Sequence, residues 1–203
     1  MLAPFKTNKN LIKSSSAIFL RLCDCHNPTT KAKHLALEEL NIQVYGCRKC
    51  RLWEGAKHGV PGEGPLNAKI MVIGQNPGAD EDETGRPFVG RAGKFLTKSL
   101  AENGIKREDI FITNIVKHVS PKNRKPYPDE VAACSPYLTS QISVIKPKII
   151  ILLGASAKET PRFEGIEYIQ VIHPSAAMRF TKMREKFRQQ IFDLAKRTAI
   201  MKS

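Results

Sequence analysis

The chain has 203 residues, of which 41% are hydrophobic and 26% charged, and this composition is typical of one globular domain. Its formal net charge of +14 favours a polyanionic partner, nucleic acid above a membrane surface. No segment approaches the ~20 apolar residues that a bilayer span needs, so we expect an intracellular protein of the cytoplasm or nucleoid with no membrane association.

Basic residues dominate the first 33 positions, which hold six Lys or Arg and one Asp and show no hydrophobic periodicity. We therefore predict a disordered basic arm over residues 1–33 and a single domain over residues 34–203. A targeting presequence or an over-extended start codon would explain the arm equally well. The domain is basic without the arm, so binding to a polyanion need not depend on it.

The five cysteines are an odd number, which suits metal ligation in a reducing compartment better than a disulfide framework. They are Cys23, Cys25, Cys47, Cys50 and Cys134. Cys-x-x-Cys followed by a His and a further Cys is also the ligand pattern of structural zinc sites, so the residues alone leave zinc open.

A helical pattern begins at His34 and leads into Cys47, and four apolar runs follow. The runs cover residues 70–73, 110–113, 149–153 and 168–172. The first three are nearly continuous, as strands covered on both faces are. Helical patterns lie between most of them and at the C-terminus, over residues 93–103, 128–145 and 183–194. The alternation predicts an α/β fold with three α/β/α layers and a central, mostly parallel four-stranded sheet.

A loop rich in Gly or polar side chains follows each predicted strand. These loops hold Gly74–Gly78, Asn114, Gly154–Ser156 and His173–Ser175. Ligands of open parallel sheets bind at the carboxyl ends of the strands, so we expect the four segments to converge on one site.

The first of these loops, Gly74-Gln75-Asn76-Pro77-Gly78, is a tight turn whose glycines let the backbone approach a ligand and whose two amides both donate and accept. The resemblance to a phosphate-binding loop is only superficial, because Gly93-Lys94 is followed by Phe95 where the pattern requires Ser or Thr. The sequence therefore does not predict an ATPase.

Together with residues 81–93, this turn closely resembles motif A of family 4 of the uracil-DNA glycosylase superfamily. Other segments resemble the family's further landmarks in the same order, over about residues 35–198: Val60–Pro65, Thr113–Lys117, Pro121–Pro126 and His173–Ser175. The resemblance implies a uracil-DNA glycosylase-like fold and a monomeric, monofunctional DNA repair enzyme. Such an enzyme flips uracil out of DNA and hydrolyses its N-glycosidic bond, which leaves an abasic site.

The resemblance also assigns the base pocket. Phe88 would stack on the flipped uracil, and the Asn114 amide would accept from N3–H and donate to O4, a polarity that rejects cytosine. His173 would donate to O2 as the base departs as an anion. Gly74 and Gly78 would let the backbone approach the base.

DNA contacts are implied outside the pocket. Ser175 would contact a phosphate, and Met178 would be the apolar wedge that fills the vacated position in the stack. Lys122, Arg124 and Lys125 would reach other phosphates.

The main departure from family 4 lies at Gln75 and Asn76, where the family usually has Glu and then Ala. Asn in the second position is similar to the mismatch-specific and thymine-DNA glycosylase branch, so we expect Asn76 to position the attacking water with support from Gln75. Without a carboxylate, two alternatives stay open: a uracil-DNA-binding family member with weak or lost hydrolysis, and a glycosylase for a broader set of deaminated bases.

A [4Fe-4S] cluster is the cofactor that the resemblance implies. Its ligands would be Cys47, Cys50, His118 and Cys134, with His118 at the position of the family's third cysteine. Structural zinc is the alternative metal, and Cys23 or Cys25 could replace His118 as a ligand. We expect a structural role for the cluster.

A relative of family 4 that captures uracil covalently also has Lys-His at the positions of Lys117 and His118, followed by a second His that attacks the sugar. No His lies between His118 and His173 in this chain. We therefore expect hydrolysis and not covalent capture.

Overall fold

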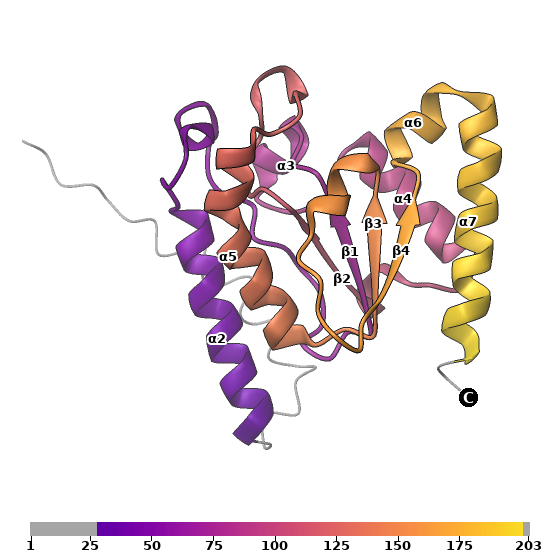
Figure 1. Cartoon of the computed structure of the whole chain (residues 1–203), viewed down its shortest axis with the longest axis horizontal. Coiled ribbons are helices and arrows are strands. Elements are labelled where there is room, and N and C mark those ends of the chain that lie inside the picture. The colour runs from indigo at the N-terminus through magenta and orange to yellow at the C-terminus, as the bar shows by residue number, and fades with distance from the viewer. Residues whose placement is uncertain (1–27, 201–203) are drawn as a thin grey trace, which may run out of the picture.

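The computed structural model describes residues 28–200, which form three layers, with helices on both sides of a central sheet (Figure 1). The helices and strands are, in chain order, α2 (Pro28–Tyr45), β1 (Ile70–Gly74), α3 (Ala79–Thr84), α4 (Arg91–Ala101), β2 (Ile110–Asn114), α5 (Pro128–Ile145), β3 (Ile149–Leu153), β4 (Glu167–Val171), α6 (Pro174–Arg179) and α7 (Thr181–Ile200). The predicted fold is confirmed, and every strand lies within one residue of its predicted run.

The sheet has the strand order β2-β1-β3-β4, and all three pairings are parallel. Ile70 of β1 pairs with Ile110 of β2 on one side and with Ile149 of β3 on the other, so these three strands begin at the same level. All four arrows point the same way, toward the edge where α3 and α6 lie (Figure 1). The four post-strand loops therefore meet at one edge of the sheet.

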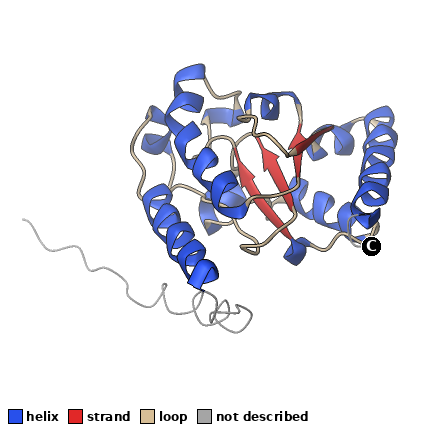
Figure 2. Ribbon diagram, turned by 60° about the horizontal axis from the view of Figure 1, so that its bottom comes forward, coloured by secondary structure: helices blue, strands red, loops and turns tan. Residues whose placement is uncertain are grey.

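Each face of the sheet has its own hydrophobic core. Helices α2 and α5 cover the face that carries Met71 and Ile73, whereas α4 and α7 cover the face that carries Ile70 and Val72. Figure 2 shows the helices on either side of the strands. Because β1, β2 and β3 are buried at every position, their sequences are mostly apolar instead of alternating, with Thr113 and Asn114 as polar residues at the end of β2.

Helix α2 begins at Pro28, so residues 28–33, which the sequence analysis placed in the disordered arm, are helical. The rest of that predicted arm, including Cys23 and Cys25, lies outside the described residues. Within residues 28–200, no helix is both long and apolar enough to cross a membrane.

The segment before β1 runs beside the edge strand β2. The Glu63 N–H donates to the Ile112 carbonyl at 3.0 Å, and the Ile112 N–H donates to the Glu63 carbonyl at 2.8 Å. This short antiparallel bridge fixes the backbone of Glu63, whose carboxylate then meets two arginines, Arg86 and Arg107.

Candidate active site

A cavity of about 370 Å³ lies at the carboxyl ends of the strands. Seven of the nine residues that the sequence analysis assigned to catalysis or substrate binding line it: Gln75, Asn76, Gly78, Phe88, Asn114, His173 and Ser175. The other two lie elsewhere, Gly74 behind the pocket wall and Met178, half-buried, on α6. Three further lining residues, Glu81, Asn123 and Ser156, had no predicted role.

Asn114 ends β2 and has the polar atom of the pocket that most needs a partner. Its side chain is 1% exposed, and its Oδ1 makes no hydrogen bond. A buried acceptor without a partner is costly unless a ligand supplies the donor. Gly74 makes room for this arrangement, because a Cβ there would lie 2.5 Å from both Asn114 Oδ1 and Phe88 Cζ.

Lys117 holds the backbone of Asn114 from behind. Its fully buried Nζ donates to the Asn114 carbonyl at 2.7 Å, to Thr113 Oγ1 at 2.8 Å and to Gln141 Oε1 at 2.8 Å. Burial lowers the pKa of Lys117 to about 7. The sequence analysis gave Lys117 no role, since a lysine after two apolar residues carries no signal that its amine turns inward.

His173 caps the N-terminus of α6, and its hydrogen bonds fix its tautomer. The Ser175 backbone N–H donates to His173 Nδ1 at 3.2 Å, so Nδ1 is an acceptor and the proton of the neutral ring lies on Nε2. Burial holds the pKa of His173 below its ordinary value. The ring therefore offers one N–H donor, and its centroid lies 6.5 Å from that of Phe88.

The amides of the first loop form one network. Gln75 Nε2 donates to Asn76 Oδ1 at 2.6 Å, and Asn76 Nδ2 donates to Asn123 Oδ1 at 2.9 Å. Ser156 Oγ donates to Gln75 Oε1 at 2.6 Å. Asn123 belongs to the Pro121–Pro126 segment, which the sequence analysis assigned to the family pattern. The sequence did not predict that this segment contacts the first loop.

The three loop cations expected to bind phosphates differ in what they contact. Arg124 makes an ion pair with the buried Glu130 at 2.6 Å, and Lys125 pairs with Glu159 at 2.9 Å. Of the three, Lys122 alone makes no ion pair among the described residues, and it is exposed. Arg124 and Lys125 thus have carboxylate partners within the chain, whereas contact of all three cations with DNA phosphates stays a prediction.

Three of the expected metal ligands are free thiols: Cys47, Cys50 and Cys134. The Cys134 thiol hydrogen-bonds Cys50, which lowers the pKa of Cys50, and the Tyr137 hydroxyl hydrogen-bonds Cys47. Within residues 28–200, no three Cys, His, Asp or Glu side chains are arranged to hold a metal ion.

His118, the fourth expected ligand, is 1% exposed. Its ring hydrogen-bonds the backbone of Cys47, and its Nδ1 has no partner. Burial lowers the pKa of this imidazole, which favours the neutral form that binds metals. The soft thiols and an unpaired buried imidazole nitrogen thus fit a thiolate-held metal centre in donor type, although the chain does not itself close the site.

Comparison with known proteins gives consistent matches. The profile of the Uracil DNA glycosylase superfamily matches residues 61–196. A type-4 uracil-DNA glycosylase of Pyrobaculum aerophilum is 39% identical over 76% of this chain and 91% of its own length. The type-4 enzymes of Sulfurisphaera tokodaii and Saccharolobus solfataricus are 52% and 57% identical over 59% and 58% of this chain. The matched segment spans about half of these last two enzymes, 54% and 55%.

Proposed function

Because the chain belongs to the uracil DNA glycosylase superfamily, we propose that it removes uracil from DNA by hydrolysing the N-glycosidic bond and leaves an abasic site. One observation carries the proposal most directly: the unpaired, buried Oδ1 of Asn114 in a cavity that also holds Phe88 and His173. A base that presents an N–H donor flanked by a carbonyl satisfies that atom, and uracil is such a base.

Base selection depends on Asn114. Its Oδ1 accepts the uracil N3–H, and its Nδ2 donates to O4. Cytosine has no hydrogen on N3 and carries an amino group in place of O4, so it would leave Oδ1 unpaired and place two donors together. A site that leaves its buried polar groups unpaired rejects the wrong ligand strongly. The Phe88 ring supplies the stacking surface for the flipped base.

Departure of the base depends on His173. The Nε2–H donates to O2, where negative charge develops as the glycosidic bond breaks. A neutral imidazole is sufficient, because the donor needs an N–H and not a positive charge. Ser175 keeps the other nitrogen occupied as an acceptor and so keeps the proton on the side of the base.

Attack by water depends on the amide network. Asn76 holds the water, Gln75 orients Asn76, and the contact with Asn123 ties both to the opposite loop. An amide cannot take the proton as a general base does. The oxocarbenium-like sugar is electrophilic, however, so a positioned water can attack before it loses its proton.

DNA binds across the rim of the cavity. Ser175 is exposed at the start of α6, where its hydroxyl would contact a phosphate. Met178, farther along α6, is the apolar wedge, and Lys122 lies exposed on the neighbouring loop. The net charge of +14 supports binding to the phosphate backbone.

A [4Fe-4S] cluster is the cofactor that fits this donor set best, with Cys47, Cys50, His118 and Cys134 as ligands and zinc as the alternative. When bound, it supplies a structural cross-link between the segments that carry its ligands. None of the four ligands lines the cavity, so the cluster would take no part in the reaction itself.

A uracil-binding protein with weak or lost hydrolysis is the second candidate. The observation that favours it is the pair of neutral amides, Gln75 and Asn76, at the water position. A broader range of deaminated bases is the third possibility for the same pocket.

The test is incubation of the purified chain with a uracil-containing single strand, a U:G duplex and a U:A duplex, followed by alkaline cleavage of abasic sites. We expect cleavage at the uracil position in at least one substrate and none with the Asn114→Ala variant. Tight binding of uracil-containing DNA without cleavage would favour the second candidate, and hypoxanthine and xanthine substrates would test the third.

A further inference from the structure

Phe88 has a backbone conformation that a phenylalanine seldom adopts. Its φ of +53° lies in the left-handed region, where the side chain of an L-amino acid crowds its own backbone. Nothing about the aromatic ring favours this conformation, so the surroundings must impose it. Strain of this kind persists where other contacts over-determine it, and it gathers at functional sites.

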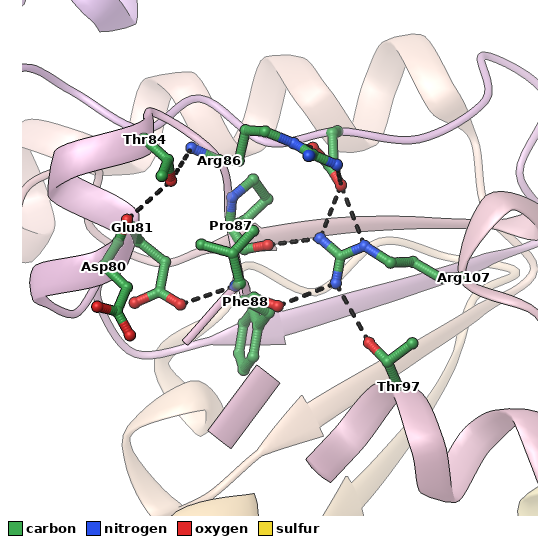
Figure 3. Close-up of polar contacts among 10 residues, drawn as sticks. Asp80, Glu81, Thr84, Arg86, Pro87, Phe88, Thr97 and Arg107 are labelled. Carbon is green, nitrogen blue, oxygen red and sulfur yellow. Dashed lines mark hydrogen bonds and ion pairs between the residues drawn. The ribbon is translucent and has the colours of Figure 1, made fainter. Parts of the chain in front are cut away.

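The contacts that impose it come from two oppositely charged side chains (Figure 3). Arg107 donates from Nη2 to the Pro87 carbonyl at 2.5 Å and from Nη1 to the Phe88 carbonyl at 3.1 Å. Glu81 Oε1 accepts from the backbone N–H groups of Val89 at 2.8 Å and Gly90 at 2.7 Å. Four consecutive residues are thus bound: Pro87 and Phe88 through their carbonyls to Arg107, and Val89 and Gly90 through their N–H groups to Glu81.

Arg107 is itself fixed in place. Its Nη2 and Nε donate to Glu63 Oε1 at 2.7 and 3.1 Å, and its Nη1 reaches Thr97 Oγ1 at 3.4 Å. Burial alone would raise the pKa of Glu63, but the hydrogen bonds from Arg86 and Arg107 hold it below its ordinary value, so Glu63 stays an anion. Glu63 in turn is anchored to β2 by its backbone. We call the hydrogen bonds of Arg107 and Glu81 with the Phe88 loop the grip, and its Arg107 side is therefore anchored to the sheet through Glu63.

The grip decides where the ring lies. The Phe88 carbonyl points to the start of α4, where a Cβ on Gly93 would come within 1.9 Å of it. The ring lies against Gly74 and in the cavity with Asn114 and His173. A change of φ at Phe88 to the ordinary negative range would swing the ring away from this position.

We propose that Arg107 is a positioning residue for the base pocket: with Glu81 on the opposite side, it holds Phe88 in the left-handed conformation that presents the ring to the flipped base before DNA binds. This inference rests on the proposed function for the role of Phe88. It makes Arg107, which does not line the cavity, a determinant of base capture.

Arg107→Lys is the sharpest variant, because a lysine keeps the charge near Glu63 but cannot donate to both carbonyls in the fixed geometry of a guanidinium. Arg86→Lys is the matched control: Arg86 donates to the same carboxylate at 2.8 Å but contacts no carbonyl of the Phe88 loop. Single-turnover excision of uracil should fall about tenfold or more in R107K and less than about twofold in R86K.

A double-mutant cycle separates positioning from general stability. If Arg107 acts through the ring, R107K should change the excision rate by less than about twofold in a Phe88→Ala background. An equal loss with and without the ring, or an R107K rate equal to wild type, overturns the proposal. If R107K does not fold, Glu81→Gln takes its place in the cycle, because its one remaining oxygen cannot accept from Gly78 and from Val89 and Gly90 as the two carboxylate oxygens do.

Crystal structures of wild type and R107K test the grip without any activity. We expect a positive φ at Phe88 in wild type and a negative φ in R107K, with the ring displaced from Gly74. A φ that stays positive in R107K overturns the inference. A wild type that excises no uracil, yet shows the change of φ, would instead count against the proposed function and leave the grip on Phe88 intact.

Discussion

The base pocket and the cysteine region differ in how much of their geometry the chain itself provides. In the pocket, residues from separate loops meet in one cavity, and the positions of Phe88, Asn114 and His173 are fixed by hydrogen bonds and packing within the chain. In the cysteine region, Cys50 pairs with Cys134, and His118 keeps an unpaired nitrogen. Among the described residues, these donors do not enclose a metal site.

This difference predicts which variants should lose catalytic rate and which should lose stability. A pocket held by the protein's own bonds is preorganised, so removing one of its groups should cost rate and little stability. A metal site gains its geometry from the metal, so removing one of its ligands should cost stability and little rate.

His173→Ala should give the largest loss within the pocket. Removing the donor takes away the hydrogen bond proposed at O2, and such a loss is worth about 10²–10³-fold in rate. The melting temperature should change little, because the ring is an N-cap of a short surface helix. Single-turnover kinetics beside thermal unfolding measure both, and a loss of stability without loss of rate would break the comparison.

Asn76→Ala should reduce excision less, by up to about 10²-fold, because it removes positioning of the water and no charge or proton transfer. Uracil-DNA binding should be nearly unchanged. Fluorescence anisotropy of a labelled strand gives the binding constant, and single-turnover excision gives the rate. Equal losses in both would contradict the assignment of Asn76 to the water.

His118→Ala should show the opposite pattern. Wild type should be brown with a broad absorbance band near ~400 nm and contain iron and sulfide. The variant should lose metal and melt about 5 °C lower, while the excision rate per folded molecule changes less than about threefold.

His118→Cys is the matched control for that variant, since it supplies a fourth thiolate and should keep the metal. A colourless wild type with one zinc per chain would replace the cluster by zinc and leave the pocket untouched. Retention of a full cluster in His118→Ala would remove His118 from the ligand set.

The smallest expected effect is that of pH on His173. Burial holds its pKa below the ordinary value for histidine, so the ring is mainly neutral at that ordinary value and at any higher pH. A neutral donor therefore loses nothing as the pH rises further. The single-turnover rate should therefore stay within about twofold between pH 6.5 and 8. A cationic catalyst would instead lose about tenfold in rate for each unit of pH above its pKa.

Much of the pocket could be predicted because it follows the strands. Apolar runs mark β1, β2 and β3, parallel strands place their carboxyl ends together, and Asn114 and His173 are found directly after two of them. The roles of three other residues, Glu81, Asn123 and Arg107, could not be predicted in the same way. Each contacts a loop whose course depends on the whole fold.

The left-handed backbone conformation of Phe88 could not be predicted from the sequence, for a related reason. A phenylalanine gives no local signal of a left-handed conformation, which here results from Arg107, nineteen positions away in the chain. The two ion pairs of Arg124 and Lys125 were missed likewise, since a basic loop predicts exposed charge and says nothing of which carboxylates lie opposite.

The most direct test of the account is the base preference of Asn114→Asp, measured as single-turnover excision from strands that differ only in uracil or cytosine. The aspartate accepts from a donor on either base but cannot donate to uracil O4. We expect uracil excision to fall and the ratio of uracil to cytosine excision to shrink relative to wild type. Unchanged uracil kinetics in this variant would show that the buried, unpaired Oδ1 and its amide do not read the base.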